Sequence, residues 1–125
     1  MNAQSDTNVR WTVVDPLGKT IKLNEDQFVR HILGAHEYKD AANRAMVESR
    51  VQKSIASPRF IIRDQNDIGR RKYLDLVDVF DGAGVKIKTL TIVVDDSDEV
   101  ITWILKRSIN DFLTEGGMIY DAQMV

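Results

Sequence analysis

The sequence contains no cysteine and only two prolines among its 125 residues. The absence of cysteine excludes disulfide bonds, thiolate catalysis and zinc sites with cysteine ligands. No apolar run approaches the roughly 18 residues that a membrane-spanning helix needs. Residues 1–10 are polar and lack the apolar centre of a signal peptide. We therefore expect a soluble protein, most simply a cytoplasmic one, with no membrane partner.

The composition is that of an ordinary folded domain. Hydrophobic residues make up 43% of the sequence and charged residues 29%, and a chain of this length can bury a core without disulfides. Since no repeat, low-complexity segment or linker divides the sequence, we expect one domain over residues 1–125, with a disordered polar lead at residues 1–8. The net charge of −2 counts mildly against a nucleic-acid-binding protein, because such proteins are often basic.

The first half of the sequence predicts a hairpin followed by two helices. Residues 10–23 contain two β-prone runs around Asp15-Pro16-Leu17-Gly18, which has the composition of a turn. Asn24 is predicted to cap a first helix, because Gln27 follows at the spacing of a capping box. Gly34 is predicted to end that helix, whose apolar stripe consists of Phe28, Ile32 and Leu33.

A second helix is predicted over residues 41–56, and Ser57-Pro58 is expected to end it. Its apolar residues recur at helical spacing and predict one buried face. That face consists of Met46, Val47, Val51 and Ile55. The side chains predicted to point outward are those of Glu48, Arg50, Gln52 and Lys53.

The second half has the period-two pattern of β-strands. Four strands are predicted at residues 59–64, 71–80, 85–94 and 100–106, with turns between them at 65–69, 81–84 and 95–99. A short extended piece is expected at residues 118–120. Helices placed ahead of successive strands with short links predict an α+β fold. In this fold an N-terminal hairpin and two helices precede a four-stranded antiparallel sheet.

The two histidines of the chain, His31 and His36, lie five residues apart. On a helix this spacing points them roughly 140° away from each other, and no His-Glu-x-x-His pattern is present, so we predict no metal site. A histidine in the last turn of a helix also interacts favourably with the helix dipole, which alone could explain His31. Since histidine titrates near neutral pH, a catalytic role is the alternative.

A catalytic role needs cationic groups nearby, and the predicted sheet is rich in them. Arg59 and Arg63 alternate with Ile61 onto one face, and Arg70, Arg71 and Lys72 stand where the second predicted strand begins. Lys86 and Lys88 alternate on the third strand, whereas acids cluster in the turn at 95–99. This uneven distribution predicts a local phosphate-binding face despite the net charge.

Five segments together carry a family resemblance: HILGAHEY (31–38), ASPRFIIRD (56–64), RRKYLDLVDVF (70–80), EVITWI (99–104) and GGMIYD (116–121). In this order they resemble the barnase–EndoU–colicin–RelE-like (BECR) nuclease group. The likeness is closest to the small toxin-like members of that group found in phages and mobile elements. The resemblance covers residues 24–121, which would form the nuclease-like core. Trp103 departs from it, because the group has a small residue after the "VIT" threonine.

The resemblance implies a metal-independent endoribonuclease without a cofactor, in which the 2′-hydroxyl of RNA attacks the neighbouring phosphate. His36 would be the general acid or base and His31 its second partner. Arg71 would clamp the phosphate, and Tyr73 and Thr102 would position it. The cations expected to hold the substrate are Arg59, Arg63, Arg70 and Lys72. The partners implied are RNA and a cognate antitoxin or immunity protein.

Two other functions stay open from the sequence. A nuclease-like domain that has lost its activity would act as a phage or accessory module that binds a protein, which Trp103 and the acidic net charge favour. An unrelated α+β domain, such as an immunity or accessory protein, also fits the acidic balance.

Overall fold

The computed structural model describes residues 8–34, 44–64, 66–67, 69–80, 84–106 and 118–124. The elements in chain order are β1 (Val9–Val14), β2 (Thr20–Asn24), η1 (Gln27–Leu33), α3 (Glu48–Ala56), β3 (Phe60–Arg63), β4 (Arg71–Phe80), β5 (Val85–Val94), β6 (Val100–Lys106), β7 (Met118–Asp121) and η3 (Ala122–Met124). The fold is therefore α+β, as the order of the sequence patterns predicts.

The main sheet has five antiparallel strands in the order β6-β5-β4-β3-β7, and β1 and β2 form a separate two-stranded sheet. The prediction of a four-stranded sheet is wrong. The C-terminal piece pairs with the free edge of β3, where Ile61 lies opposite Tyr120. This pairing joins segments about 60 residues apart in the sequence, so no local sequence pattern predicts it.

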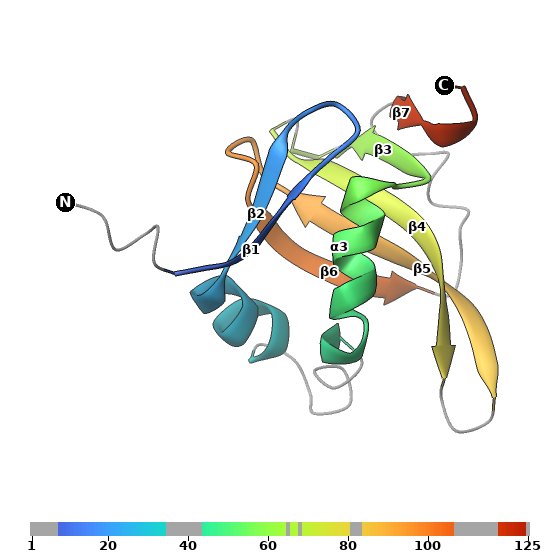
Figure 1. Ribbon diagram of the computed structural model, residues 1–125, viewed down its shortest axis with the longest axis horizontal. Coiled ribbons are helices and arrows are strands. Elements are labelled where there is room, and N and C mark those ends of the chain that lie inside the picture. The colour runs from blue at the N-terminus through green and yellow to red at the C-terminus, as the bar shows by residue number, and fades with distance from the viewer. Residues whose placement is uncertain are drawn as a thin grey trace.

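The hairpin, η1 and α3 all lie on one face of the main sheet (Figure 1), which we call the inner face. Because side chains alternate along a strand, every second residue of the sheet points into this layer. Tyr73 of β4, Ile92 of β5 and Trp103 of β6 lie opposite one another across three strands, and all three are fully buried. The hairpin adds Ile21 and Leu23 to the same core.

Helix α3 contributes Val51 and Ile55 to the core, and Val47, just before it, is buried as predicted. Met46 is 52% exposed, so its predicted burial is wrong. Val47 has φ −97° and ψ 7°, which interrupts the helical geometry. The helical residues 44–46 therefore do not continue the face of α3. Within the described ranges, no helix has both the length and the apolar character needed to cross a membrane.

Helix η1 is a π-helix with Phe28 and Ile32 buried. The predicted cap by Asn24 is wrong, because Asn24 is the last residue of β2 and no side chain caps the helix. The Gln27 side chain instead donates a hydrogen bond to the carbonyl oxygen of Ile101, at 2.6 Å. The helix ends at Gly34 as predicted, and the Gly34 amide donates to the Val29 carbonyl at 2.9 Å.

Gly34→Ala should lower the free energy of unfolding by about 1–3 kcal/mol, the usual cost of overpacking. A Cβ atom at this position would lie 2.8 Å from the Val29 carbonyl oxygen and 3.0 Å from that of Arg30. Gly69→Ala is the matched control, because its Cβ would meet only ordinary contacts, at 3.4 Å or more. Urea denaturation measures both. Equal losses for the two variants would contradict the close approach at Gly34.

Candidate functional site

Two of the predicted site residues, Arg71 and Tyr73, stand side by side at the start of β4 and point to the inner face. The Tyr73 hydroxyl donates a hydrogen bond to Oδ2 of Asp15 in the hairpin turn, at 2.5 Å. Arg71 Nη2 donates to Oδ1 of Asp98 at 2.7 Å and lies 3.5 Å from the Tyr73 hydroxyl oxygen. This Asp15–Tyr73–Arg71–Asp98 cluster links the hairpin, β4 and the turn between β5 and β6.

Both carboxylate oxygens of Asp15 accept hydrogen bonds from the protein. Its Oδ1 atom accepts hydrogen bonds from the amides of Leu17 and Lys19, both at 2.9 Å. Asp15 is 4% exposed. The aspartate that precedes Pro16 therefore orders the turn through Oδ1 and fixes the turn to the sheet through Oδ2.

The protonation of the cluster follows from burial and hydrogen bonding. Burial raises the pKa of Tyr73 well above its ordinary value, and the hydrogen bond to Asp15 raises it further, because both favour the neutral phenol. Burial opposes the charged form of Arg71, but its hydrogen bonds to Asp98 and Tyr73 outweigh that cost and raise its pKa. At neutral pH the cluster thus holds a neutral phenol and an arginine already paired with a carboxylate.

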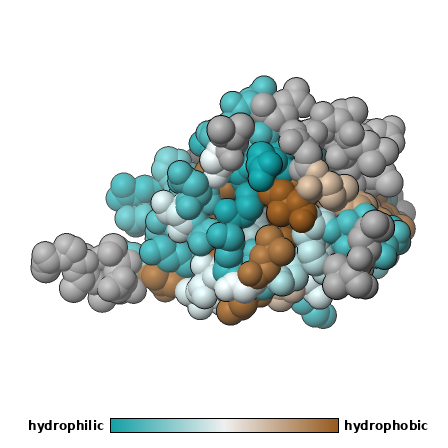
Figure 2. All heavy atoms as spheres, turned by 90° about the horizontal axis from the view of Figure 1, so that it is seen from above, coloured by the Kyte–Doolittle hydropathy of each residue, from teal (hydrophilic) through white to brown (hydrophobic). Residues whose placement is uncertain are grey.

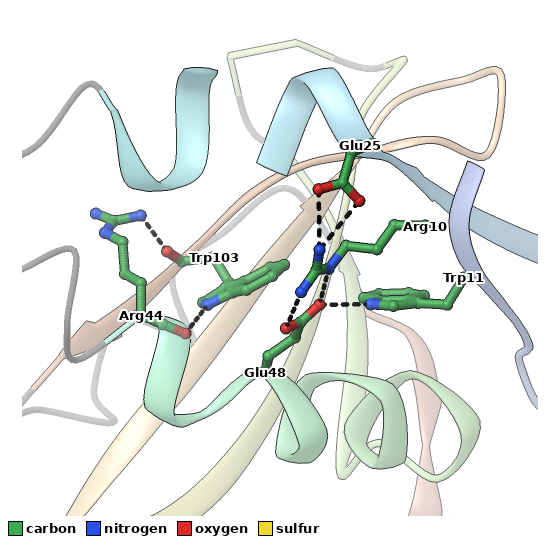
Figure 3. Close-up of polar contacts among 6 residues, drawn as sticks. All are labelled: Arg10, Trp11, Glu25, Arg44, Glu48 and Trp103. Atoms are coloured by element: carbon green, nitrogen blue, oxygen red, sulfur yellow. Dashed lines mark hydrogen bonds and ion pairs between the residues drawn. The ribbon is translucent and has the colours of Figure 1, made fainter. Parts of the chain in front are cut away.

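Thr102 is also engaged by a protein side chain. Its hydroxyl oxygen accepts a hydrogen bond from Nη1 of Arg44 at 3.0 Å. The same Arg44 atom donates to the Trp103 carbonyl, and the Trp103 indole donates to the Arg44 carbonyl at 3.0 Å (Figure 3). The indole packs 5.9 Å from the Phe28 ring, measured between centroids. Trp103 is thus a fully buried core residue that joins β6 to Arg44, which precedes α3.

The histidines do not join this cluster. His31 is exposed on η1, and among the described contacts none connects it to Arg71 or Tyr73. Tyr73 binds the turn of the hairpin, whereas η1 follows the opposite end of the five-residue strand β2, roughly 17 Å away. His36 lies outside the described residues.

The cations predicted to hold RNA are spread over both faces of the sheet. Arg63 lies opposite Arg71 in the β3–β4 register, so these two share the inner face, whereas Lys72 points to the other face. Arg59 stacks over the Phe60 ring at 5.7 Å, and Arg70 pairs with Asp67 at 3.3 Å. Of the four cations predicted to hold the substrate, Arg63 is the one that the register places beside Arg71.

An open cleft of about 270 Å³ lies between the loop that precedes β4 and the turn that precedes β6. It is lined by Asp67, Gly69, Arg70, Asp95, Asp96 and Ile101. Carboxylates outnumber the one guanidinium, so the cleft disfavours phosphate groups. Viewed from above, hydrophilic side chains cover most of this end of the molecule (Figure 2). Within the described part of the chain, no three histidine or acidic side chains converge as metal ligands do.

A second polar cluster joins the hairpin to both helical segments, and no motif of the sequence predicts it. Arg10 of β1 binds the Glu48 carboxylate through two nitrogens, at 2.5 and 2.9 Å, and reaches both oxygens of Glu25 at 3.0 Å (Figure 3). The Trp11 indole also donates to Glu48, at 2.9 Å. Glu48 was predicted to point into solvent, and that prediction is wrong. Arg10 lowers its pKa and holds it as a carboxylate.

No protein-family model, curated protein sequence or solved structure matches this chain. The functional interpretation therefore rests on the geometry of its own residues.

Tyr73→Phe should lower the free energy of unfolding by about 1–3 kcal/mol near neutral pH, because it leaves a buried oxygen of Asp15 without its donor. The pH dependence should change as well. In the wild type the folded state keeps the Tyr73 proton while the unfolded chain loses it above pH ~10, so stability falls as pH rises.

This alkaline slope reaches at most about 1.4 kcal/mol per pH unit, and Tyr73→Phe should abolish it. Denaturant titrations between neutral pH and pH ~11 measure the slope, and Tyr120→Phe, at a half-buried position, should keep it. Parallel curves for wild type and Tyr73→Phe would disprove the buried phenol.

Glu48→Gln should cost about 1–3 kcal/mol of stability, since it breaks a charge-assisted pair with Arg10. Glu25→Gln is the matched control, with the same partner and a side chain 45% exposed against 17% for Glu48. Its cost should stay below about 1 kcal/mol because solvent screens exposed pairs. Thermal and urea denaturation give both values, and the reverse order would refute this ranking.

Proposed function

We propose that this chain is a non-enzymatic domain that binds another protein. The observation that carries the proposal is a pair of exposed apolar side chains, Val85 and Ile87, which are 59% and 67% exposed. Both belong to one end of β5, where the strand has left the rest of the sheet.

This end of β5 is part of a projecting ribbon, which we define as residues 75–80 of β4 and 85–88 of β5. Strand β3 pairs only with residues 71–74 of β4, and β6 pairs only with residues 89–94 of β5. Beyond these limits the two strands pair with each other alone within the described sheet, and they extend past its body (Figure 1). A projecting two-stranded ribbon with apolar side chains on one face is suited to protein contact.

The polar residues expected to act on RNA support the same proposal. Arg71 is paired with Asp98, the Tyr73 phenol is buried against Asp15, and Thr102 accepts a hydrogen bond from Arg44. A phosphate would have to displace these contacts, each of which joins elements of the fold. Ribonuclease activity that uses His36 stays a prediction, and a cytoplasmic location is part of the present proposal.

Incubation of the purified protein with total RNA, in EDTA and separately in Mg²⁺, tests the absence of catalysis. We expect intact RNA in both, and no retention of RNA whose strength falls with salt. His31→Gln, at an exposed position, and His36→Gln serve as control variants.

Cleavage by the wild type that His36→Gln abolishes would overturn the proposal in favour of an enzyme. Cleavage that survives both histidine variants calls for a second purification by another route. Loss of the cleavage then assigns it to a contaminating nuclease, whereas cleavage that persists overturns the proposal.

A further inference from the structure

Three strand edges of this protein differ in how their backbone groups are used. On the outer side of β6 and of the turn before it, three carbonyls are bonded: Asp98 accepts from the Lys22 amide at 3.0 Å, Ile101 accepts from Gln27, and Trp103 accepts from Arg44. Segments from the hairpin and both helical regions thus occupy the places of a neighbouring strand. This edge is closed to a further strand.

The β4 side of the ribbon is guarded by acidic residues. The Leu76 amide, which faces away from β5, donates to Oδ1 of Asp75 at 2.9 Å. The other oxygen of Asp75 accepts from the Ser54 hydroxyl of α3 at 2.8 Å, which holds the carboxylate in place. Asp78, two residues after Leu76, adds an exposed charge. Exposed charges on a strand edge discourage pairing with another strand.

The β5 side of the ribbon differs: its charges are those of Lys86 and Lys88, and within the described residues no segment pairs with its backbone. The Leu74 carbonyl accepts from the Arg59 amide, so even-numbered residues of β4 turn their backbone groups away from β5. The uninterrupted β4–β5 register then makes the odd-numbered residues of β5 face the β6 side. β6 pairs no further along β5 than Thr89, so among the described strands none pairs with the amides and carbonyls of Val85 and Ile87.

We propose that this edge binds an extended segment of another protein, added to β5 as a strand in line with β6. The inference rests on the proposed protein-binding function and names the partner's chemistry. Backbone hydrogen bonds at Val85 and Ile87 would hold the segment, as in other cases of strand addition. Its residues opposite Val85 and Ile87 would share their face of the sheet, so these residues are apolar.

The lysines of β5 determine which residues of the partner segment alternate with the apolar ones. Lys86 and Lys88 point to the inner face, because they alternate with Val85 and Ile87 and precede the buried Leu90 in the same phase. A residue opposite either lysine would occupy a non-hydrogen-bonded pair, in which side chains approach most closely. The partner segment therefore alternates acidic and apolar residues.

A second copy of this chain fits the edge poorly. Two β5 edges paired antiparallel, with Val85 and Ile87 in hydrogen-bonded positions, would place the lysines at 86 and 88 of one copy opposite lysines of the other. Like charges directly opposite each other destabilise a strand pair. The charge pattern thus favours a foreign acidic segment over self-association.

Two fluorescent synthetic peptides test the inference on the full chain, one with the sequence Glu-Val-Glu-Val-Glu and one with lysine in place of each glutamate. We expect the acidic peptide to bind about tenfold more tightly, as a few cross-strand charge pairs allow. It should also slow hydrogen exchange at the amides of Val85 and Ile87. Lys86→Glu/Lys88→Glu should reverse the preference, whereas the exposed-turn variant Lys19→Glu should not.

Ile87→Ser should weaken binding of the acidic peptide without changing the circular dichroism spectrum. Val14→Ser, also at an exposed apolar position, should leave the binding unchanged. Equal affinity for both peptides, or slowed exchange at other amides, would overturn the inference and leave the proposed protein-binding function standing. A wild-type dimer that Ile87→Ser dissociates would overturn it in favour of a second copy. Failure of the proposed function is read separately, from RNA cleavage.

Discussion

The buried carboxylate of Asp15 is the contact on which the arrangement of this protein depends. One of its oxygens orders the hairpin turn and the other accepts the Tyr73 hydroxyl of the main sheet. Holding that turn against β4 helps the hairpin cover the inner face, because a two-stranded hairpin alone is marginally stable. At its other end, Arg10 and its two carboxylates fix the hairpin to α3 and to the residues before η1.

The polar residues that suggest catalysis are likewise hydrogen-bonded to other parts of the protein. Buried polar groups in proteins are usually hydrogen-bonded, although Asn24 Oδ1 and Arg71 Nε are exceptions here. Arg71, Tyr73 and Thr102 find theirs across element boundaries, and these contacts hold the hairpin and the segment before α3 on the sheet. Strand edges follow the same rule: β6 is closed by side chains and by β2, while the end of β5 projects beyond these protections.

Sequence patterns located most elements well. The bounds of β4, β5 and β6 agree with prediction because alternating apolar residues and Gly- or Asp-rich turns are local signals. Errors arose where a distant segment decided the outcome. The position of Gln27 predicts a capping box, but its side chain donates a hydrogen bond to Ile101. The position of Glu48 predicts a solvent-exposed helix residue, but its carboxylate binds Arg10. Neither partner lies within the window in which a motif is recognised.

Local patterns suffice to predict the α+β class, the hairpin turn at Asp15, the three long strands and the burial of Val51 and Ile55 on α3, since each depends on residues within a few positions of one another. Only the tertiary structure decided that β7 adds a fifth strand, that Trp103 lies in the core, and that Arg71 is neutralised by Asp98. These outcomes depend on which distant groups meet when the layers pack, and a buried polar atom takes whichever partner that packing brings within reach.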